Sequence, residues 1–170
     1  MWLGTGGGGL NSFENGRFHA FGKGGPVSGV IYSITGDPNG TLWPGTNGSG
    51  LVRYKDGRFS ALTGKTGFFE DSIFGMIRDD DGNAWLSSNR GIFRVGMNDL
   101  NRLADGFIRH LNYREFGQAD GMKSPRMQWR LPAFRVENER WAPAVSHHEG
   151  HGDDRPEAPE PESRASAGLD

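Results

Sequence analysis

Apolar residues recur in short runs of strand length along the first 124 residues, and turn residues separate the runs. Residues 30–34 and 72–77 are such runs, and each is followed by aspartate, asparagine and glycine. A strand that carries tryptophan comes next, at Trp43 and Trp85, and then a glycine-rich turn and an alternating strand such as residues 51–55. Asn-Gly and Asp-Gly supply the positive φ angles of tight hairpins, so the pattern predicts antiparallel strands joined by short turns.

This pattern is an internal repeat. Trp2, Trp43 and Trp85 lie 41 and 42 residues apart and occupy the same place in each copy. A second tight turn at residues 56–57 leads to an outer strand that begins at Arg58, which makes four short strands per copy. A period of about 40 to 45 residues with glycine turns is typical of β-propeller blades. The sequence predicts an all-β fold, an incomplete β-propeller of about two to three four-stranded antiparallel blades, whose large apolar side chains pack between neighbouring blades.

The third copy departs from the repeat after Val95. Residues 98–104 are predicted to form a helical turn, residues 107–113 a further strand, and residues 120–124 a connection to another blade. The predicted propeller segment is thus residues 1–124.

Residues 125–170 differ in composition from the repeats. They contain 6 of the 9 prolines and 3 of the 28 glycines, and residues 153–170 are acidic and without aromatic side chains. Such a segment buries too little apolar surface to offset the entropy of ordering, so a disordered C-terminal tail is expected.

The repeat resembles a known family. Residues 30–54 hold its elements in order: Ser33-Ile34, Asp37, Gly40, Leu42-Trp43, Gly45-Thr46, Gly50-Leu51 and Arg53-Tyr54. Residues 74–94 match more loosely, since Ser87-Ser88 replace Gly-Thr and Ala84 replaces leucine. Over residues 2 to 124 the chain resembles the two-component regulator propeller repeat. The resemblance implies a fragment of a periplasmic input domain of a sensor histidine kinase, which binds an unknown small molecule or glycan.

The same resemblance suggests a second origin for residues 125–170. The family pattern would continue with another blade, whereas this sequence departs from it after about Ser124. Reading the gene one base later places a cysteine codon at Met127-Gln128 and glycine codons at Trp129-Arg130 and Trp141-Ala142, and permissive codons elsewhere restore the blade pattern. The tail is therefore expected to be disordered or derived from a frameshift, and the nucleotide sequence distinguishes the two.

Composition excludes several partner classes. A formal net charge of −2 gives no broad attraction to nucleic acid. The chain has no cysteine, so it forms no disulfide. Its apolar runs are shorter than the 18 residues of a membrane helix, so no direct membrane insertion is expected. No basic stretch followed by an apolar one opens the sequence, so no signal peptide is expected in this chain.

Two glycine motifs resemble phosphate-binding loops. Residues 4–9 satisfy G-x-G-x-x-G, but strand-like residues and an Asn-Gly turn follow where a dinucleotide site needs a helix. Gly64-Lys65-Thr66 lacks the glycine five residues before Gly64, where Phe59 stands. Both motifs are predicted to be turns or loops, and no cofactor is expected.

Three groups of residues are candidates for metal binding or catalysis. Residues 79–82 read Asp-Asp-Asp-Gly, but Arg90 stands where a calcium loop needs glutamate, so a solvated hairpin turn is predicted. His147, His148 and His151, with Asp153 and Asp154, are the densest set of metal ligands and lie beside the predicted disordered tail, so an adventitious role is expected. His19 and His110 are isolated in strand-like segments. The tryptophans could stack on sugar rings, although their regular phase favours core packing. No catalytic, cofactor-binding or metal residues are therefore assigned.

The sequence leaves three functional hypotheses. The first is a non-catalytic ligand-sensing or interaction module from a two-component sensor. The second is a fragment of a propeller-type enzyme, a lyase or a glycan-processing protein, for which no convergent acid–base pair is visible. The third is a structural platform for protein interaction. Because two or three blades leave an unpaired face at each end, the isolated polypeptide is expected to be poorly soluble or oligomeric.

Overall fold

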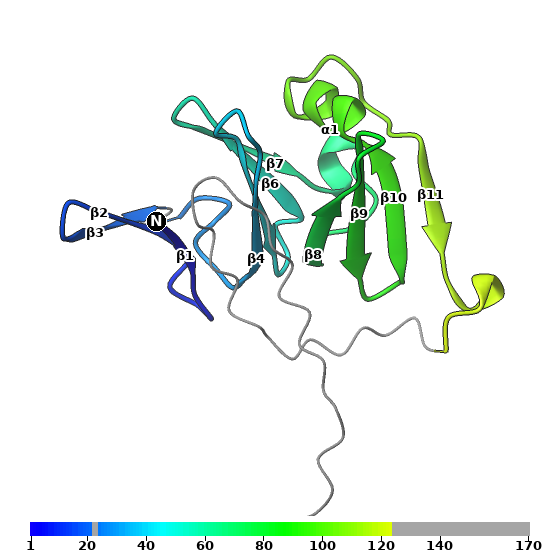
Figure 1. The fold of residues 1–170 in the computed structure, drawn as a ribbon, viewed down its shortest axis with the longest axis horizontal. Coiled ribbons are helices and arrows are strands. Elements are labelled where there is room, and N and C mark those ends of the chain that lie inside the picture. Colours follow the sequence, from blue (N-terminus) through cyan, green and yellow to red (C-terminus); the bar gives the residue numbers. More distant parts are fainter. Residues whose placement is uncertain (22–23, 124–170) are drawn as a thin grey trace, which may run out of the picture. The chain divides into compact units, whose positions relative to one another are not determined.

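The computed structural model describes residues 1–21 and 24–123. The predicted tail at residues 125–170, with His147, His148 and His151, lies outside the described residues. The described chain is mostly β and forms three separate antiparallel sheets in sequence order, shown in Figure 1.

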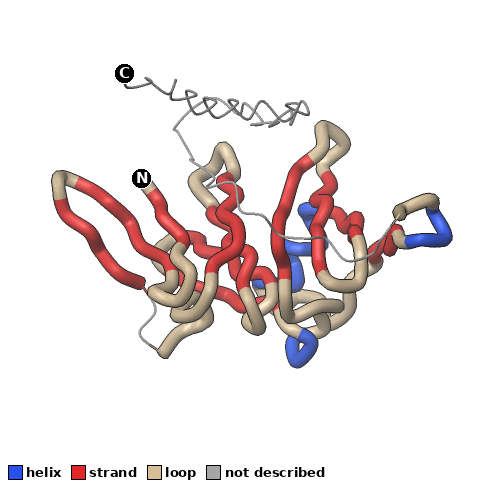
Figure 2. The backbone as a smooth tube through the Cα atoms, turned by 90° about the horizontal axis from the view of Figure 1, so that it is seen from below, coloured by secondary structure: helices blue, strands red, loops and turns tan. Residues whose placement is uncertain are grey.

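The first sheet has three strands: β1 (Trp2–Gly4), β2 (Leu10–Glu14) and β3 (Arg17–Phe21). The second sheet has four: β4 (Ile31–Gly36), β5 (Leu42–Thr46), β6 (Leu51–Lys55) and β7 (Arg58–Leu62). The third also has four: β8 (Ile73–Arg78), β9 (Asn83–Ser88), β10 (Ile92–Gly96) and β11 (Tyr113–Phe116). Helix α1 spans Met97–Ala104, and the 3-10 turns η1 and η2 span Gly64–Thr66 and Gln118–Asp120. Figure 2 shows how short loops join the strands.

The predicted units of four antiparallel strands are confirmed in the second and third sheets. The first sheet has three strands, and its described residues include no counterpart of β4 and β8. Tight turns form where Asn-Gly and Asp-Gly predict them. Asn15 and Asp56 have φ of 50°, and the glycines after them have φ of 77° and 76°. This pair of positive φ angles matches the right-handed twist of the strands that the turn joins.

One predicted strand is displaced. Residues 107–113 were expected to form it, whereas the fourth strand of the third sheet is Tyr113–Phe116. Residues from 107 to 112 instead return the chain from α1, whose position at 98–104 was predicted and is confirmed. Leu111 is buried in this return segment, and only the residues after it lie in register with β10.

The glycine of each Gly-Leu or Gly-Ile motif has a steric role. Gly50 has φ of 68°, and a Cβ placed on it would lie 1.9 Å from the carbonyl oxygen of Leu62. Gly9 and Gly91 have positive φ too, and a Cβ on either would meet a carbonyl oxygen at 2.3 and 2.5 Å. The repeat therefore needs glycine here so that the main chain of a neighbouring segment can approach.

Two hydrophobic clusters hold the sheets together. One joins the first and second sheets around Leu10, Val27 and Val52. The other joins the second and third sheets and includes Trp43, which is 0% exposed, and Leu100 from α1. Strands β4 and β8 lie beside each other at this second junction. The prediction that large apolar side chains pack between successive units is confirmed at both junctions.

Candidate functional site

Strand alternation gives the third sheet one covered side and one solvent-facing side. In β9, Ala84, Leu86 and Ser88 are buried, whereas Asn83, Trp85 and Ser87 between them are partly exposed. Ala84 and Leu86 belong to the cluster shared with the second sheet. Trp85 therefore lies on the side that faces away from the second sheet.

We call this side the open face. It comprises Ile77, Asp79, Trp85, Arg94, Arg114 and Phe116. Cross-strand pairing places Ile77 opposite Trp85, Trp85 opposite Arg94, and Arg94 opposite Arg114. Ile77 is 67% exposed and lies opposite Trp85, whose ring stacks on Phe116, so the open face carries a group of neighbouring apolar side chains.

Asp79 anchors the indole of Trp85. Its carboxylate accepts hydrogen bonds from Trp85 Nε1 at 2.8 Å and from the main-chain N–H of Asn83 at 2.8 Å. The Asn83 main-chain hydrogen bond is the largest cause that lowers the pKa of Asp79 from 3.8 to about 2, with smaller contributions from Trp85 and Arg94. The open face thus carries a carboxylate that stays charged at all physiological pH values.

The two arginines of the open face are directly opposite each other on β10 and β11. Arg94 lies over the Trp85 ring at 5.6 Å and Arg114 over the Phe116 ring at 4.6 Å. The two rings stack with centroids 5.3 Å apart. Like charges opposite each other are unfavourable, and here carboxylates at 3.8 Å compensate, Asp79 for Arg94 and Asp120 for Arg114.

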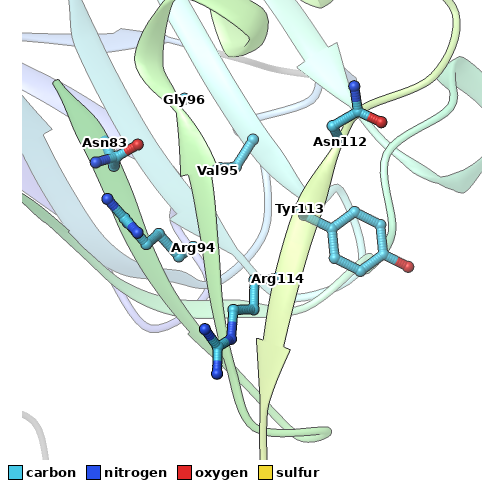
Figure 3. Close-up of a pocket in the computed structure, with 7 residues that line it drawn as sticks. All are labelled: Asn83, Arg94, Val95, Gly96, Asn112, Tyr113 and Arg114. Carbon is cyan, nitrogen blue, oxygen red and sulfur yellow. The ribbon is translucent and has the colours of Figure 1, made fainter.

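A polar cavity of about 310 Å³ lies beside these side chains. Figure 3 shows its lining residues: Asn83, Arg94, Val95, Gly96, Asn112, Tyr113 and Arg114. The arginines and amides can donate hydrogen bonds and suit an acceptor-rich partner.

The corresponding face of the second sheet is buried. Asp37 accepts a hydrogen bond from Trp43 Nε1 at 3.1 Å, as Asp79 does from Trp85. It also forms an ion pair at 2.6 Å with Arg78 of the third sheet. The third sheet thereby covers Trp43, while Trp85 stays partly exposed.

Arg53 strengthens the same junction from the outer side. Its side chain, on β6, is 6% exposed, and it donates to the carbonyl oxygen of Asn101 at 3.3 Å and to Asn101 Oδ1 at 3.1 Å. Arg53 also forms an ion pair with the carboxylate of Asp105, to which it donates a hydrogen bond. This hydrogen bond is the main cause that lowers the pKa of Asp105. A cavity of about 460 Å³ adjoins this contact and is lined by Arg53, Lys55, Asp56, Arg58, Ser60, Ala104 and Asp105.

The glycine motifs lie in turns and loops. Residues 4–9 connect β1 to β2, and Leu10 begins a strand rather than the helix of a dinucleotide site. Thr5 Oγ1 donates to the Gly9 carbonyl at 2.9 Å, and Thr46 repeats this contact with Gly50. Gly64-Lys65-Thr66 forms η1, in which Lys65 is exposed.

Of the candidate titratable residues, the two isolated histidines lie on different parts of the chain, and the turn at residues 79–82 has a role that the sequence did not predict. His19 on β3 and His110 after α1 are both exposed. The turn at residues 79–82 is not merely solvated, since Asp79 binds the indole of Trp85. Sequence reasoning missed this role, although the spacing of six residues from aspartate to tryptophan occurs twice, at Asp37-Trp43 and Asp79-Trp85.

Within residues 1–21 and 24–123, no three His, Asp or Glu side chains are grouped to hold a metal ion. In the same part of the chain, no helix is long and apolar enough to span a bilayer.

Comparison with known proteins gives a likeness at the level of fold. No family model matches the sequence, and no curated protein matches it significantly. The structure is similar to the extracellular domain assigned to a hybrid two component system, BT3049, from B. thetaiotaomicron, with a TM-score of 0.56 and 22% identity over 74% of this chain. PorZ, a surface component of the type-IX secretion system of Porphyromonas gingivalis, gives a TM-score of 0.45 and 20% identity over 56% of the chain. This chain spans 16% and 15% of the two proteins.

Proposed function

We propose that this chain is a section of a β-propeller in the periplasmic or extracellular input domain of a two-component sensor. In this role it is a non-catalytic module for ligand sensing and interaction. The observation that carries the proposal is the similarity of its fold to part of the extracellular domain of a hybrid two component system. The in-phase repeat of four-stranded sheets supports the propeller architecture.

The side chains of the described sheets suit recognition. Arg94, Arg114, Asn83 and Asn112 line one cavity with hydrogen-bond donors. Hydrogen bonds from Asn83 and from Arg53 hold the pKa values of Asp79 and Asp105, respectively, below the ordinary aspartate value, so both carboxylates stay charged. A general acid or base needs a pKa near the working pH, so these shifts favour binding over proton transfer.

Two other functions remain as alternatives. A lyase or glycan-processing propeller would use the same architecture for chemistry, and an interaction platform would use it for protein contacts. The genes beside the coding sequence bear on the choice. A histidine kinase or response regulator next to it favours sensing, whereas a sugar-processing operon favours the enzyme.

A direct test combines binding with product analysis. The full chain is melted in the presence of a panel of oligosaccharides, acidic and neutral, and each incubation is then analysed by chromatography. Sensing predicts that one sugar class raises the melting temperature and is recovered intact. Recovery of shortened or unsaturated sugars would instead establish the enzyme. If no sugar changes the melt, glycan sensing by this section is excluded.

The arginine cavity supplies a matched control. Arg114→Gln removes one charge from the lining of the 310 Å³ cavity and lies on the exposed strand β11. Arg17→Gln removes a charge from an exposed position on β3 in the first sheet. Binding at the cavity predicts that only the first substitution weakens the response to acidic sugars.

A further inference from the structure

The open face of the third sheet has the same side-chain plan as the face of the second sheet that the third sheet covers. The plan is an aspartate after the first strand, a tryptophan on the second strand and an arginine on the third. The corresponding pairs are Asp37 and Asp79, Trp43 and Trp85, and Arg53 and Arg94. In both sheets the aspartate accepts a hydrogen bond from the indole N–H of its tryptophan.

The two copies of this plan differ in their partners. In the second sheet, partners come from the following part of the chain: Arg78 for Asp37, and Asn101 and Asp105 for Arg53.

In the third sheet, Asp79 and Arg94 have only each other as an ionic partner among the described residues, at 3.8 Å. Arg94 Nε is buried and makes no hydrogen bond there. Arg94 therefore keeps capacity for further hydrogen bonds, since a guanidinium can donate five. The oxygens of Asp79 already accept hydrogen bonds from Asn83 and Trp85, but its negative charge has only this one cation, 3.8 Å away, among the described residues.

The first strand shows the same contrast. Thr35 on β4 is buried, and its Oγ1 donates to the carbonyl oxygen of Met76 on β8 at 2.9 Å. Ile77 occupies the equivalent place on β8 and is 67% exposed. The third sheet thus has an apolar side chain where the second sheet has a hydrogen-bonding one. A sheet that covered Ile77 would be stabilised by the burial of this side chain.

We propose that a further four-stranded sheet packs on the open face. It carries an arginine or lysine at the end of its first strand, which binds Asp79 as Arg78 binds Asp37. It also presents a carboxylate or a main-chain carbonyl to Arg94, as α1 and Asp105 do to Arg53. This inference rests on the proposed propeller architecture and specifies the chemistry of the next sheet.

A second copy of the chain fits this face less well. Two open faces packed together would bring Arg94 and Arg114 of each copy near those of the other, which is repulsive.

The test uses the absence of cysteine from the chain. Ile77→Cys places one thiol on the open face. Phe18→Cys is the matched control, because Phe18 is 68% exposed on the first sheet. The probe sheet is a second copy of residues 71–123, inserted between Lys123 and Ser124 of the full chain, so that its own Arg78 faces Asp79. Reaction of the thiols with a maleimide is followed in the chain with and without the insert.

Docking predicts that the insert slows labelling of Ile77→Cys by about tenfold or more, because a covered thiol reacts only when the contact opens. Labelling of Phe18→Cys stays unchanged. Arg78→Glu in the inserted copy, but not Arg102→Glu there, restores fast labelling. Equal labelling with and without the insert overturns the proposal. Labelling that slows with protein concentration in the chain without an insert also overturns it, in favour of a second copy.

These measurements involve no ligand. A covering sheet and an acidic sugar would compete for Arg94 and Arg114, which line the 310 Å³ cavity. The sugar response is therefore measured in the chain without the insert, and protection of Ile77→Cys in the chain with it, so either result can fail while the other holds. Failure of the docking proposal is therefore distinguishable from failure of the proposed sensing function.

Discussion

Asp37 and Arg78 are 41 residues apart in the sequence, and their side chains meet at 2.6 Å. The Asp37 side chain is 7% exposed, and it also receives the indole N–H of Trp43 at 3.1 Å. One carboxylate thus orients the tryptophan of its own sheet and fixes the next sheet against it. A buried carboxylate that loses one of these partners must bear the cost of desolvation.

Substitution of Arg78 tests the strength of this junction. Arg78→Met leaves Asp37 with one side-chain partner, and we expect it to lower the free energy of unfolding by about 1–3 kcal/mol, less than for a fully buried pair since Arg78 is partly exposed. Arg102→Met is the control, because its pair with Asp99 is exposed and should contribute about 0–1 kcal/mol. Urea denaturation measures both. Equal losses would contradict the role assigned to Asp37.

Trp43 and Trp85, which occupy the same repeat position, should differ in their contribution to the free energy of unfolding. Trp43→Ala leaves a cavity between two sheets and is expected to cost about 3–5 kcal/mol. Trp85→Ala removes a partly exposed ring and should cost about 1–2 kcal/mol. Chemical denaturation of both variants compares them. A loss at Trp85 as large as at Trp43 would mean that the open face is already covered in the isolated chain.

Glycine at the start of β6 is expected to be indispensable. Gly50→Ala adds a Cβ where the Leu62 carbonyl oxygen lies 1.9 Å away, so the variant should lose about 3 kcal/mol or more. Gly57→Ala is the matched control. Its φ is also positive, but no atom lies within 4 Å of the added Cβ, so the loss should be about 1–2 kcal/mol. Thermal melts of the two variants should separate the steric clash from the cost of φ, and a smaller loss for Gly50→Ala than for Gly57→Ala would refute the clash.

Acid should lower the stability of the fold through protonation of Asp79. The pKa of this carboxyl is lowered from 3.8 to about 2. A lowered folded-state pKa stabilises the fold fully above the unfolded value of 3.8, and the contribution disappears as the pH falls through 2. Asp79→Asn should therefore lower the melting temperature at pH 6 and have less effect near pH 2. Asp81→Asn, at an exposed position of the same turn, is the matched control. A pH profile for Asp79→Asn that is the same as the profile for Asp81→Asn would contradict the role assigned to Asp79.

The sequence was sufficient for the strands whose ends are marked by turns. Asp56-Gly57 and Asn15-Gly16 predict hairpins because their side chains tolerate positive φ, and the structure has both. A helical turn at residues 98–104 was also predicted, and α1 spans these residues. Residues 107–113 have strand-like composition, but Leu111 is needed in the core and the register with β10 starts only at Tyr113. Tertiary packing, which a local pattern does not contain, decided this boundary.

The candidate site was less predictable. Aspartates before a glycine in a hairpin look like ordinary turn residues, so the bond from Trp85 to Asp79 was missed. The contacts of Arg53 with Asn101 and Asp105 depend on α1, which has no equivalent in the second sheet. A repeat predicts what its copies share, and these contacts arise where the third copy departs from the second.

Helix α1 lies where the second and third sheets meet, with Leu100 and Leu103 in their common core and Arg53 bonded to its last turn. It acts as a spacer between the outer strands, while the inner strands β4 and β8 remain in direct contact. We expect the size of this spacer to set the angle between the second and third sheets. A change in helix length would consequently alter the curvature of any larger array that contains this pair, without a single substitution in the strands themselves.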